Sequence, residues 1–418
     1  MQFLNHYFRN PNKLHFSFMQ IIEVKESSAV KAFHKVAHMI YKNDQNWVPP
    51  LEVLEDATFD PAKNAFYQHG EGTRWILKDN DNAVIGRIGA FINTNKAYTF
   101  KQPTGGCGFF ECINSQEAAN LLFDTAKIWL AERGMEAMDG PVNFGENLIN
   151  WGLLVEGFMQ QGFGMPYNKP YYLQLFENYG FKVYFEQYSY HLNHKEPFPE
   201  RFWKIAEWVA KKPNFHFEPV RFDNIEKYIQ DFIKIYELAW ARHDNHQAVN
   251  LDDIRGMMKI AKLIAEEDFI WFAYHNNEPV LLFGMIPDWN QILKKLNGKL
   301  NWWTILKFIW YKKIKTITRT RILLMGVVPK FQGTGLESAV FWHLDKVMQR
   351  KLWYNEVELS WVGDFNPKMV SIYRSVGSVP AKTHYTMRYL FDRTVEFERA
   401  PMLMKEVRTG QSENNQDK

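Results

Sequence analysis

The chain carries the same series of local patterns twice, once in each half of its 418 residues. Each series has two strand-like runs around a polar turn, a third strand, an amphipathic helix, a fourth strand and a short helix that ends at a glycine. The turns are Asp79–Asn82 and His275–Glu278, and the closing glycines are Gly180 and Gly377. Turn residues between strand-like runs predict hairpins, and glycine commonly ends a helix. This diverged repeat predicts two similar folding units.

The order of elements predicts a mixed α/β (α+β) fold, in which each half is a mixed central sheet flanked by helices. Apolar residues recur at helical spacing within 121–130 and 336–347, so each of these helices would present one apolar face. The chain is too long for one ordinary core. We therefore expect an N-terminal domain at 1–197, a C-terminal domain at 198–404 and a disordered tail at 405–418.

The composition favours a globular protein in a reducing compartment. Hydrophobic residues make up 46% of the chain and charged residues 23%, and residues 1–20 lack the continuous apolar stretch of a signal peptide. Cys107 and Cys112 are the only cysteines, and their odd spacing within a strand would point them to opposite faces. We expect neither a disulfide nor a metal site, and a cytoplasmic location.

A strand in the second half runs through a glycine-rich turn into an amphipathic helix. The stretch from Val327 to Leu336 reads Val-Val-Pro-Lys-Phe-Gln-Gly-Thr-Gly-Leu. Glycines let a ligand approach the backbone, and the free N–H groups at a helix start attract a phosphate. Strand-to-helix turns also use glycine for geometry alone, so the turn taken by itself leaves both roles open.

This turn resembles the donor motif of the GNAT acyltransferase superfamily, which runs from a strand into Gln or Arg, two residues, Gly, one residue, and Gly or Ala. Gln332 and Gly335 match it, whereas Glu337 stands where a small residue is usual. A second match is the spacing of Asn366, Tyr373 and Gly377, although Ser378 replaces the usual Phe. The resemblance implies that acetyl-CoA or another acyl-CoA is a co-substrate, with no tightly bound cofactor. The implied donor-binding residues are Gly326, Val327, Val328, Gln332, Gly333, Thr334, Gly335, Leu336 and Asn366.

The same resemblance implies that Tyr373 is the general acid for the leaving thiolate; a tyrosine of the core is the alternative. An attacking amine must be neutral, so a base is useful. Strand alternation places Glu356, Glu358 and Ser360 on one face, and Glu358 is our candidate base. A solvated strand carboxylate is the other interpretation of Glu358.

The first half lacks these features and is predicted to be non-catalytic. Glu111–Ser115 replaces the glycine turn, and Phe176 stands four residues before Gly180, where Tyr373 stands before Gly377. The polar loop that follows the fourth strand contains Asn143, Glu146 and Asn147, which would bind an acceptor substrate; a loop bonded to itself is the alternative. The whole chain resembles a poorly characterised bacterial tandem-GNAT family.

The leading hypothesis is N-acyl transfer to an amine from acyl-CoA or an acyl carrier protein. Residues 290–321 hold seven Lys, two Arg, five aromatic residues and no acid. This composition is typical of an interfacial anchor, and it favours a lipid amine such as a sphingoid base and contact with the inner membrane surface. An aromatic-rich element packed on its domain, with the lysines in water, is the alternative. The same charge would also suit an aminoacyl-tRNA-dependent transferase, for which nucleic-acid binding is the test, and a non-catalytic GNAT-fold binding protein remains open.

Overall fold

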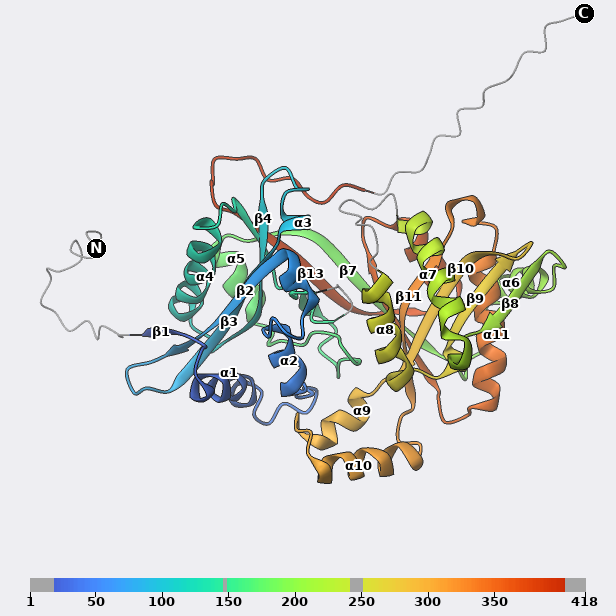
Figure 1. The fold of residues 1–418 in the computed structure, drawn as a ribbon, viewed down its shortest axis with the longest axis horizontal. Coiled ribbons are helices and arrows are strands. Elements are labelled where there is room, and N and C mark those ends of the chain that lie inside the picture. Colours follow the sequence, from blue (N-terminus) through green and yellow to red (C-terminus); the bar gives the residue numbers. More distant parts are fainter. Residues whose placement is uncertain (1–18, 146–148, 241–250, 403–418) are drawn as a thin grey trace, which may run out of the picture.

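A computed structural model describes residues 19–145, 149–240 and 251–402 (Figure 1). The strands of the first half are β1 (Gln20–Glu23), β2 (Gly70–Lys78), β3 (Val84–Asn93), β4 (Thr104–Cys112), β5 (Ala137–Gly140), β6 (Leu153–Glu156) and β7 (Lys182–Asn193). Its helices are α1 (Ser27–Ile40), α2 (Glu52–Thr58), α3 (Thr94–Ala97), α4 (Gln116–Ala131) and α5 (Tyr172–Tyr179), with a 3₁₀ turn at Ala65–His69.

The second half repeats this order of elements. Its strands are β8 (Phe215–Pro219), β9 (Ile270–His275), β10 (Glu278–Pro287), β11 (Arg319–Val327), β12 (Glu356–Gly363) and β13 (Val379–Leu390). Its helices are α6 (Glu200–Ala210), α7 (Ile225–Trp240), α8 (Leu251–Ile264), α9 (Asn290–Leu293), α10 (Trp302–Lys313), α11 (Leu336–Arg350) and α12 (Pro367–Ser375). The predicted hairpins, helices and strands therefore form where the sequence placed them. The predicted tail lies outside the described residues.

Local signals in the sequence explain where the helices begin and end. The Ser115 side chain accepts the N–H of Ala118 at the start of α4, and the Asn366 side chain accepts the N–H of Met369 at the start of α12. Gly180 follows α5 with a φ of 111°, a left-handed conformation that favours glycine. The predicted apolar faces of α4 and α11 are buried in the two main cores.

All the strands join one mixed sheet in the order β1-β2-β3-β4-β5-β13-β7-β12-β11-β10-β9-β8, with β6 paired to β13. The last strand of each half lies in the other half: β7 pairs antiparallel with β12, and β13 pairs antiparallel with β5. The two exchanged strands also pair with each other, so they cross the middle of the molecule (Figure 1). The boundary at 197/198 stays a prediction, and the sheet is continuous across it.

Helices cover both faces of the sheet in each half. In the first half, Trp75 and Leu77 of β2 pack in the core that α4 covers, whereas Ile76 packs with Phe33 of α1 on the opposite face. In the second half α11 lies over one face, and α7 and α8 lie over the other. Cys107 and Cys112 are both buried and free. The expected fold class is confirmed.

Candidate active site

The glycine turn between β11 and α11 presents backbone N–H groups at the start of a 15-residue helix. Gly333 and Gly335 have φ values of 73° and 88°, which other residues rarely adopt. The Gln332 side chain donates to the carbonyl of Val327 at 3.1 Å and so closes the turn. Gly326, Val327 and Leu336 are buried beneath it, whereas Gln332, Gly333 and Thr334 are exposed. The turn is therefore exposed at the positively polarised end of α11, where an anion is favoured, although the N–H groups of Gln332 and Thr334 already bond the carbonyls of Pro329 and Phe331.

Glu337 already directs a carboxylate into this turn. Its Oε1 accepts the backbone N–H of Gly333 at 3.2 Å, and the residue is only 6% exposed. Burial raises the pKa of the Glu337 carboxyl, although hydrogen bonds from backbone N–H groups and the charge of Lys368 act against this rise. A carboxylate in this position competes with a phosphate for the Gly333 N–H.

Tyr373 lies on α12 where strands β11 and β12 separate. The parallel pairing of these strands ends at Ile322 and Leu359, and the Tyr373 hydroxyl donates to the carbonyl of the next residue, Ser360, at 3.3 Å. Tyr373 is 3% exposed, and burial raises its pKa even though Arg321 lies close enough to lower it. The hydroxyl is therefore protonated at neutral pH, at the edge of the opening between two strands.

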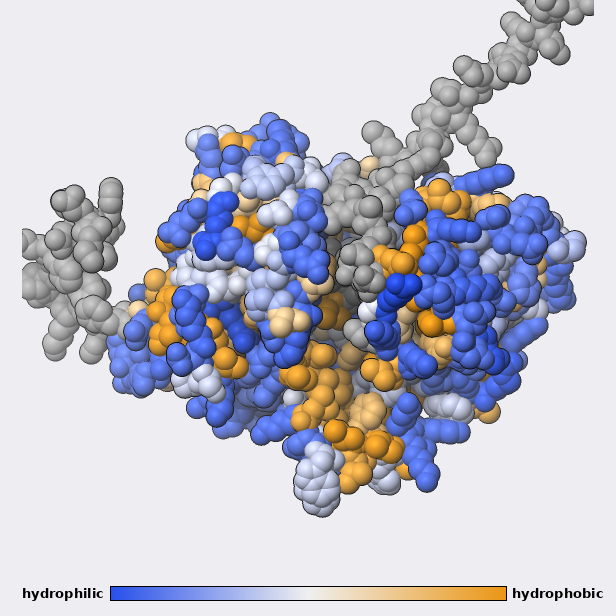
Figure 2. All heavy atoms as spheres, viewed as in Figure 1, coloured by the Kyte–Doolittle hydropathy of each residue, from blue (hydrophilic) through white to orange (hydrophobic). Residues whose placement is uncertain are grey.

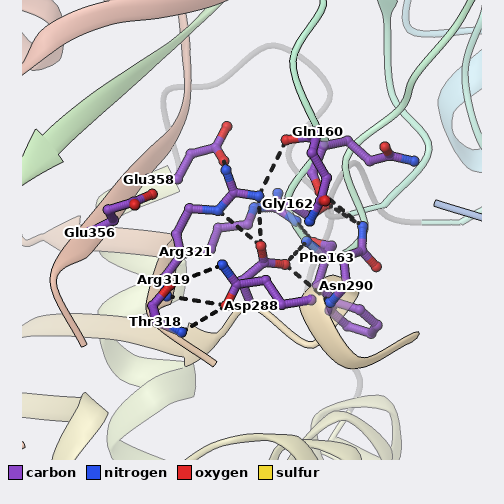
Figure 3. A network of polar contacts seen from close by, with 12 residues as sticks. Gln160, Gly162, Phe163, Asp288, Asn290, Thr318, Arg319, Arg321, Glu356 and Glu358 are labelled. Carbon is purple, nitrogen blue, oxygen red and sulfur yellow. Dashed lines mark hydrogen bonds and ion pairs between the residues drawn. The ribbon is translucent and has the colours of Figure 1, made fainter. Parts of the chain in front are cut away.

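A network of buried charges joins the two halves beside this opening (Figure 3). Asp288, which is fully buried, accepts two hydrogen bonds from Arg319, at 2.9 and 2.7 Å, and the N–H of Phe163 from the first half at 2.8 Å. Arg319 also lies 3.7 Å from Glu358, whose other oxygen pairs with Lys382 of β13. Every charge in this network has an opposite charge beside it, as burial demands.

The structure places Glu358 inside this network and not at a solvated surface, so the solvated interpretation is wrong. Burial acts to raise its pKa, but Lys382 and Arg319 outweigh burial and hold the pKa below the ordinary range. A carboxylate with a lowered pKa accepts a proton poorly. The role of Glu358 as a base stays a prediction that this geometry weakens.

Several buried polar groups near the exchanged strands have no hydrogen-bond partner among the described residues. They include the Nε1 of Trp151, the Oγ atoms of Ser189 and Ser360, and both ring nitrogens of His384. The His384 ring lies 4.7 Å from that of Trp151 and beside the carbonyl of Pro166, outside hydrogen-bond geometry. Burial, with Lys382 and Arg321 nearby, lowers the pKa of His384 to about 3, so the ring is neutral. Buried polar groups nearly always have a hydrogen-bond partner, so each of these exceptions needs an explanation.

An aromatic cavity of about 260 Å³ lies where the two halves meet. Its eight aromatic lining residues include Phe91 and Phe144 of the first half and Trp361 and Phe365 of the second. Asn143, a predicted acceptor residue, also lines it. The other two residues of that prediction, Glu146 and Asn147, lie outside the described residues.

The chain is similar to known proteins in sequence and in structure. No family model matches the chain. Over 378 residues it is 28% identical to a protein named bacterial ceramide synthase from Caulobacter vibrioides, covering 88% of this chain and 96% of the relative. Over 365 residues it is 25% identical to the Escherichia coli protein YghO, covering 85% and 91%. These relatives match along almost their whole length.

Two solved structures decide the fold. A tandem GNAT protein from the clavulanic acid biosynthesis pathway superposes with a TM-score of 0.54 at 10% identity, covering 89% of this chain and 98% of that protein. A GCN5-related N-acetyltransferase from Sphaerobacter thermophilus gives 0.52 at 11% identity, covering 91% and 98%. The chain has the tandem-GNAT fold.

Within the tandem-GNAT fold the two halves differ in the predicted way at two positions. Phe176 is fully buried in the first core, where it stacks edge-on against Phe123 with ring centroids 4.8 Å apart. Glu111, at the end of β4, accepts hydrogen bonds from Tyr41 and Tyr172 at 2.8 and 2.7 Å, and burial raises its pKa to about 7. The first half thus has packed side chains where the second half has the glycine turn and Tyr373.

The buried network was not predicted, because Arg319 and Arg321 were counted with the surface cations of the 290–321 segment. Both are buried, at 8% and 1% exposure, so that part of the interpretation is wrong. The signal lies in the alternation of charge: in the parallel register Arg319 faces Glu356, and Arg321 faces Glu358. Two cations at alternate positions of one strand, matched by two acids on another, indicate a buried polar face.

Proposed function

We propose that the protein is an N-acyltransferase that moves an acyl group from an acyl-CoA or acyl carrier protein thioester to an amine. The observation that carries the proposal is the glycine turn at the start of α11, close to strands that separate at Tyr373. In this arrangement the turn would hold the donor's phosphate. The pantetheine arm would enter between β11 and β12, past Asn366 and along Gly326, Val327 and Val328.

The reaction exchanges a C–S bond for a C–N bond. The neutral amine attacks the thioester carbonyl, the amide forms and the thiolate leaves. Tyr373 supplies a proton or a hydrogen bond to that thiolate. Unperturbed tyrosine has a pKa about 1.5 units above a thiol, so full proton transfer is uphill by about 2 kcal/mol. Because burial raises the pKa of Tyr373 further, we favour hydrogen-bond donation as its main role. Glu358 remains the candidate for taking the proton of the amine.

A lipid amine is the acceptor class we favour. The relative named bacterial ceramide synthase carries ceramide in its name, and ceramide is the amide of a long-chain base with a fatty acid. The similarity spans 88% of this chain, so it includes both halves. We therefore place a long-chain amine, and a fatty acyl thioester as its donor, first among the substrates to be tried.

The α10 segment supports contact with a membrane surface. All seven lysines between residues 290 and 321 are exposed, and Trp302, Trp303 and Trp310 are 59%, 61% and 55% exposed. Hydrophobic side chains gather at the lower edge of the molecule in Figure 2, where Figure 1 places α10. Each lysine near an anionic surface adds about 1 kcal/mol of attraction, and the aromatic side chains add a term that salt does not screen. No helix in the described part of the chain combines the length and apolar character needed to cross a bilayer.

Product formation from a fatty acyl-CoA and a long-chain amine, followed by mass spectrometry, tests the proposed function. Calorimetry with CoA tests the donor site separately, with Gly335→Asp as the variant that disturbs the turn, because Gly335 has a φ of 88° and a Cβ there would lie 3.0 Å from Val209 of α6. We expect amide formation in the wild type and weakened CoA binding in Gly335→Asp. The absence of an amide from any acyl donor, carrier-bound acyl groups included, would refute the acyltransferase. Equal CoA binding in the variant would refute only the placement of the donor.

Vesicle flotation tests the membrane contact. We expect binding to anionic vesicles that weakens in high salt without vanishing, and that falls sharply in the Trp302→Ala, Trp303→Ala double variant. Trp208→Ala is the matched control, since Trp208 is 61% exposed on α6, outside this segment. No association at low salt would contradict the contact, and steep salt dependence with competition by RNA would favour a tRNA substrate instead.

A further inference from the structure

The aromatic cavity between the halves is lined by residues that lie far apart in the sequence. Phe91 and Phe144 stack with ring centroids 5.4 Å apart and 18° between the ring planes. On the other side Phe185 of β7 stacks on Trp361 of β12, at 6.1 Å and 20°, and meets Phe365 edge-on at 5.3 Å. Aromatic pairs of this geometry are stable and have few rotamers. Stacked aromatic side chains from both halves therefore form the walls of the cavity.

Two features shape the wall of the cavity. Gly106 of β4 lines it, and a Cβ at this position would lie 2.4 Å from Phe91 and 2.9 Å from Val142, two other lining residues. Arg388 stands behind the wall with its guanidinium 3.7 Å from the ring centroid of Tyr184, and it forms two hydrogen bonds with Asp139, at 2.6 and 2.8 Å. The ion pair and the ring contact neutralise both charges. A ligand in the cavity thus meets eight aromatic side chains, alongside polar lining residues that include Asn93, Lys96 and Thr104.

Asn143, at the cavity wall, carries a polar atom that lacks a partner among the described residues. Asn143 lines the cavity and is 9% exposed, and its Oδ1 has no hydrogen-bond partner among the described residues. A buried amide oxygen without a partner costs about 1–3 kcal/mol, so a ligand that draws the Asn143 amide toward the cavity and donates a hydrogen bond to it would recover this cost. A hydroxyl, amine or amide N–H next to an alkyl chain has the required chemistry.

In the sequence, one residue of the cavity wall lies next to a residue that contacts Tyr373. Trp361 forms part of its wall, and the preceding residue, Ser360, accepts the hydrogen bond of Tyr373. A chain lying against Trp361 would therefore reach β12 next to the residue that holds Tyr373.

We propose that this cavity binds one alkyl chain of a lipid substrate, with the Asn143 Oδ1 accepting a hydrogen bond from a polar group at the head of that chain. This inference rests on the proposed acyl transfer and names the substrate class of that same site. The chain belongs either to the amine or to the acyl group of the donor. Both sources share the chemistry that the cavity recognises, and the experiment separates them.

The test places a large side chain at the cavity wall. Ala400 lines the cavity in an extended segment whose N–H bonds to the carbonyl of Tyr184, and Ala400→Trp adds a large side chain there. Met402→Trp is the matched control, because Met402 is 55% exposed and does not line the cavity. Thermal melts confirm that both variants fold. Two probes are used, a long-chain amine and a fatty acyl-CoA, each with a photoreactive diazirine near the end of its chain.

We expect one of the two probes to crosslink to cavity residues in the wild type and in Met402→Trp, and to lose these crosslinks in Ala400→Trp. That probe identifies the source of the chain. For the same substrate, kcat/KM of the longest chains should fall by about tenfold or more in Ala400→Trp, while short chains change little.

The outcomes separate the inference from the proposed function. If neither probe crosslinks to the cavity in the wild type, the inference is wrong, whether or not amide is formed. If a probe crosslinks there but no amide is formed with any donor, the acyltransferase is wrong and the lipid site stands. Crosslinks to cavity residues that persist unchanged in Ala400→Trp would show that the chain does not fill the cavity as proposed.

Discussion

Replacing Glu337 with glutamine is expected to tighten the binding of CoA. The carboxylate accepts the Gly333 N–H at 3.2 Å, so it lies within hydrogen-bond distance of the backbone that would hold the donor phosphate. Two like charges 4 Å apart repel by about 1 kcal/mol in water and by about 4 kcal/mol at an effective dielectric constant of about 20. Because the turn is largely exposed, we take the lower part of this range. Removing the repulsion should make CoA binding more favourable by about 1.4 kcal/mol, which lowers Kd by about tenfold.

The pH dependence of binding gives a second readout. Burial raises the pKa of Glu337 above its ordinary value of 4.5, so the folded protein holds this proton more tightly than the unfolded chain. The contribution of Glu337 to stability is therefore fully present below pH 4.5. It is lost as the pH rises through the pKa that Glu337 has in the folded protein. An anionic ligand raises this pKa further. CoA binding should therefore take up a proton and become tighter as the pH falls from neutral, and Glu337→Gln should lose that pH dependence.

Calorimetric titration with CoA at several pH values measures both effects. Asp345→Asn is the matched control, since it removes the same charge from α11 eight positions further along, about 12 Å away. The control should leave Kd and its pH dependence unchanged. If Glu337→Gln binds CoA no more tightly than the wild type, with the same pH profile, then the carboxylate does not oppose the donor and the argument from its position is wrong.

Three further predictions concern the reaction, the buried network and the exchanged strands. Tyr373→Phe should lower kcat by about 10²- to 10⁴-fold without unfolding the protein, while Phe176→Tyr should add no activity; equal turnover in Tyr373→Phe would remove the role of the hydroxyl. Asp288→Asn leaves Arg319 with one charged partner fewer, so it should lower the free energy of unfolding by about 3–5 kcal/mol. Calorimetry should show this as a fall in Tm of about 3–6 °C, and an unchanged Tm would contradict the role given to this ion pair. Residues 1–197 expressed alone should aggregate, because β5 and β7 lose β13, and co-expression with 198–404 should restore solubility; a stable, monomeric fragment would argue against the strand exchange.

The sequence was sufficient for the elements whose causes are local. Apolar spacing located α4 and α11, and the Asn366 cap and Gly377 bounded the short helix that carries Tyr373. The glycine turn was also visible, because its two positive φ values require glycine. In each of these cases the physical cause lies within about one or two turns of chain.

Long-range pairing could not be read in the same way. The pattern of an apolar strand does not specify its neighbour, so nothing local in β7 or β13 indicates that they exchange places. The cavity was hidden for the same reason, since its lining residues run from Phe66 to Pro401 and meet only in the folded chain. Arg319 was misassigned because the composition of a segment does not distinguish a solvated cation from one buried against Asp288.

The exchanged strand β13 gives a physical reason for keeping a half that lacks the donor turn. Its Lys382 pairs with Glu358 of the second half, and its Arg388 pairs with Asp139 of the first half. Between them Thr386 lines the aromatic cavity. One strand therefore supports the charge network next to Tyr373 and the wall of the cavity at the same time. If the cavity holds the alkyl chain, the first half serves as the lipid-binding part of a single site, and the two halves cannot be separated without dismantling both parts of it.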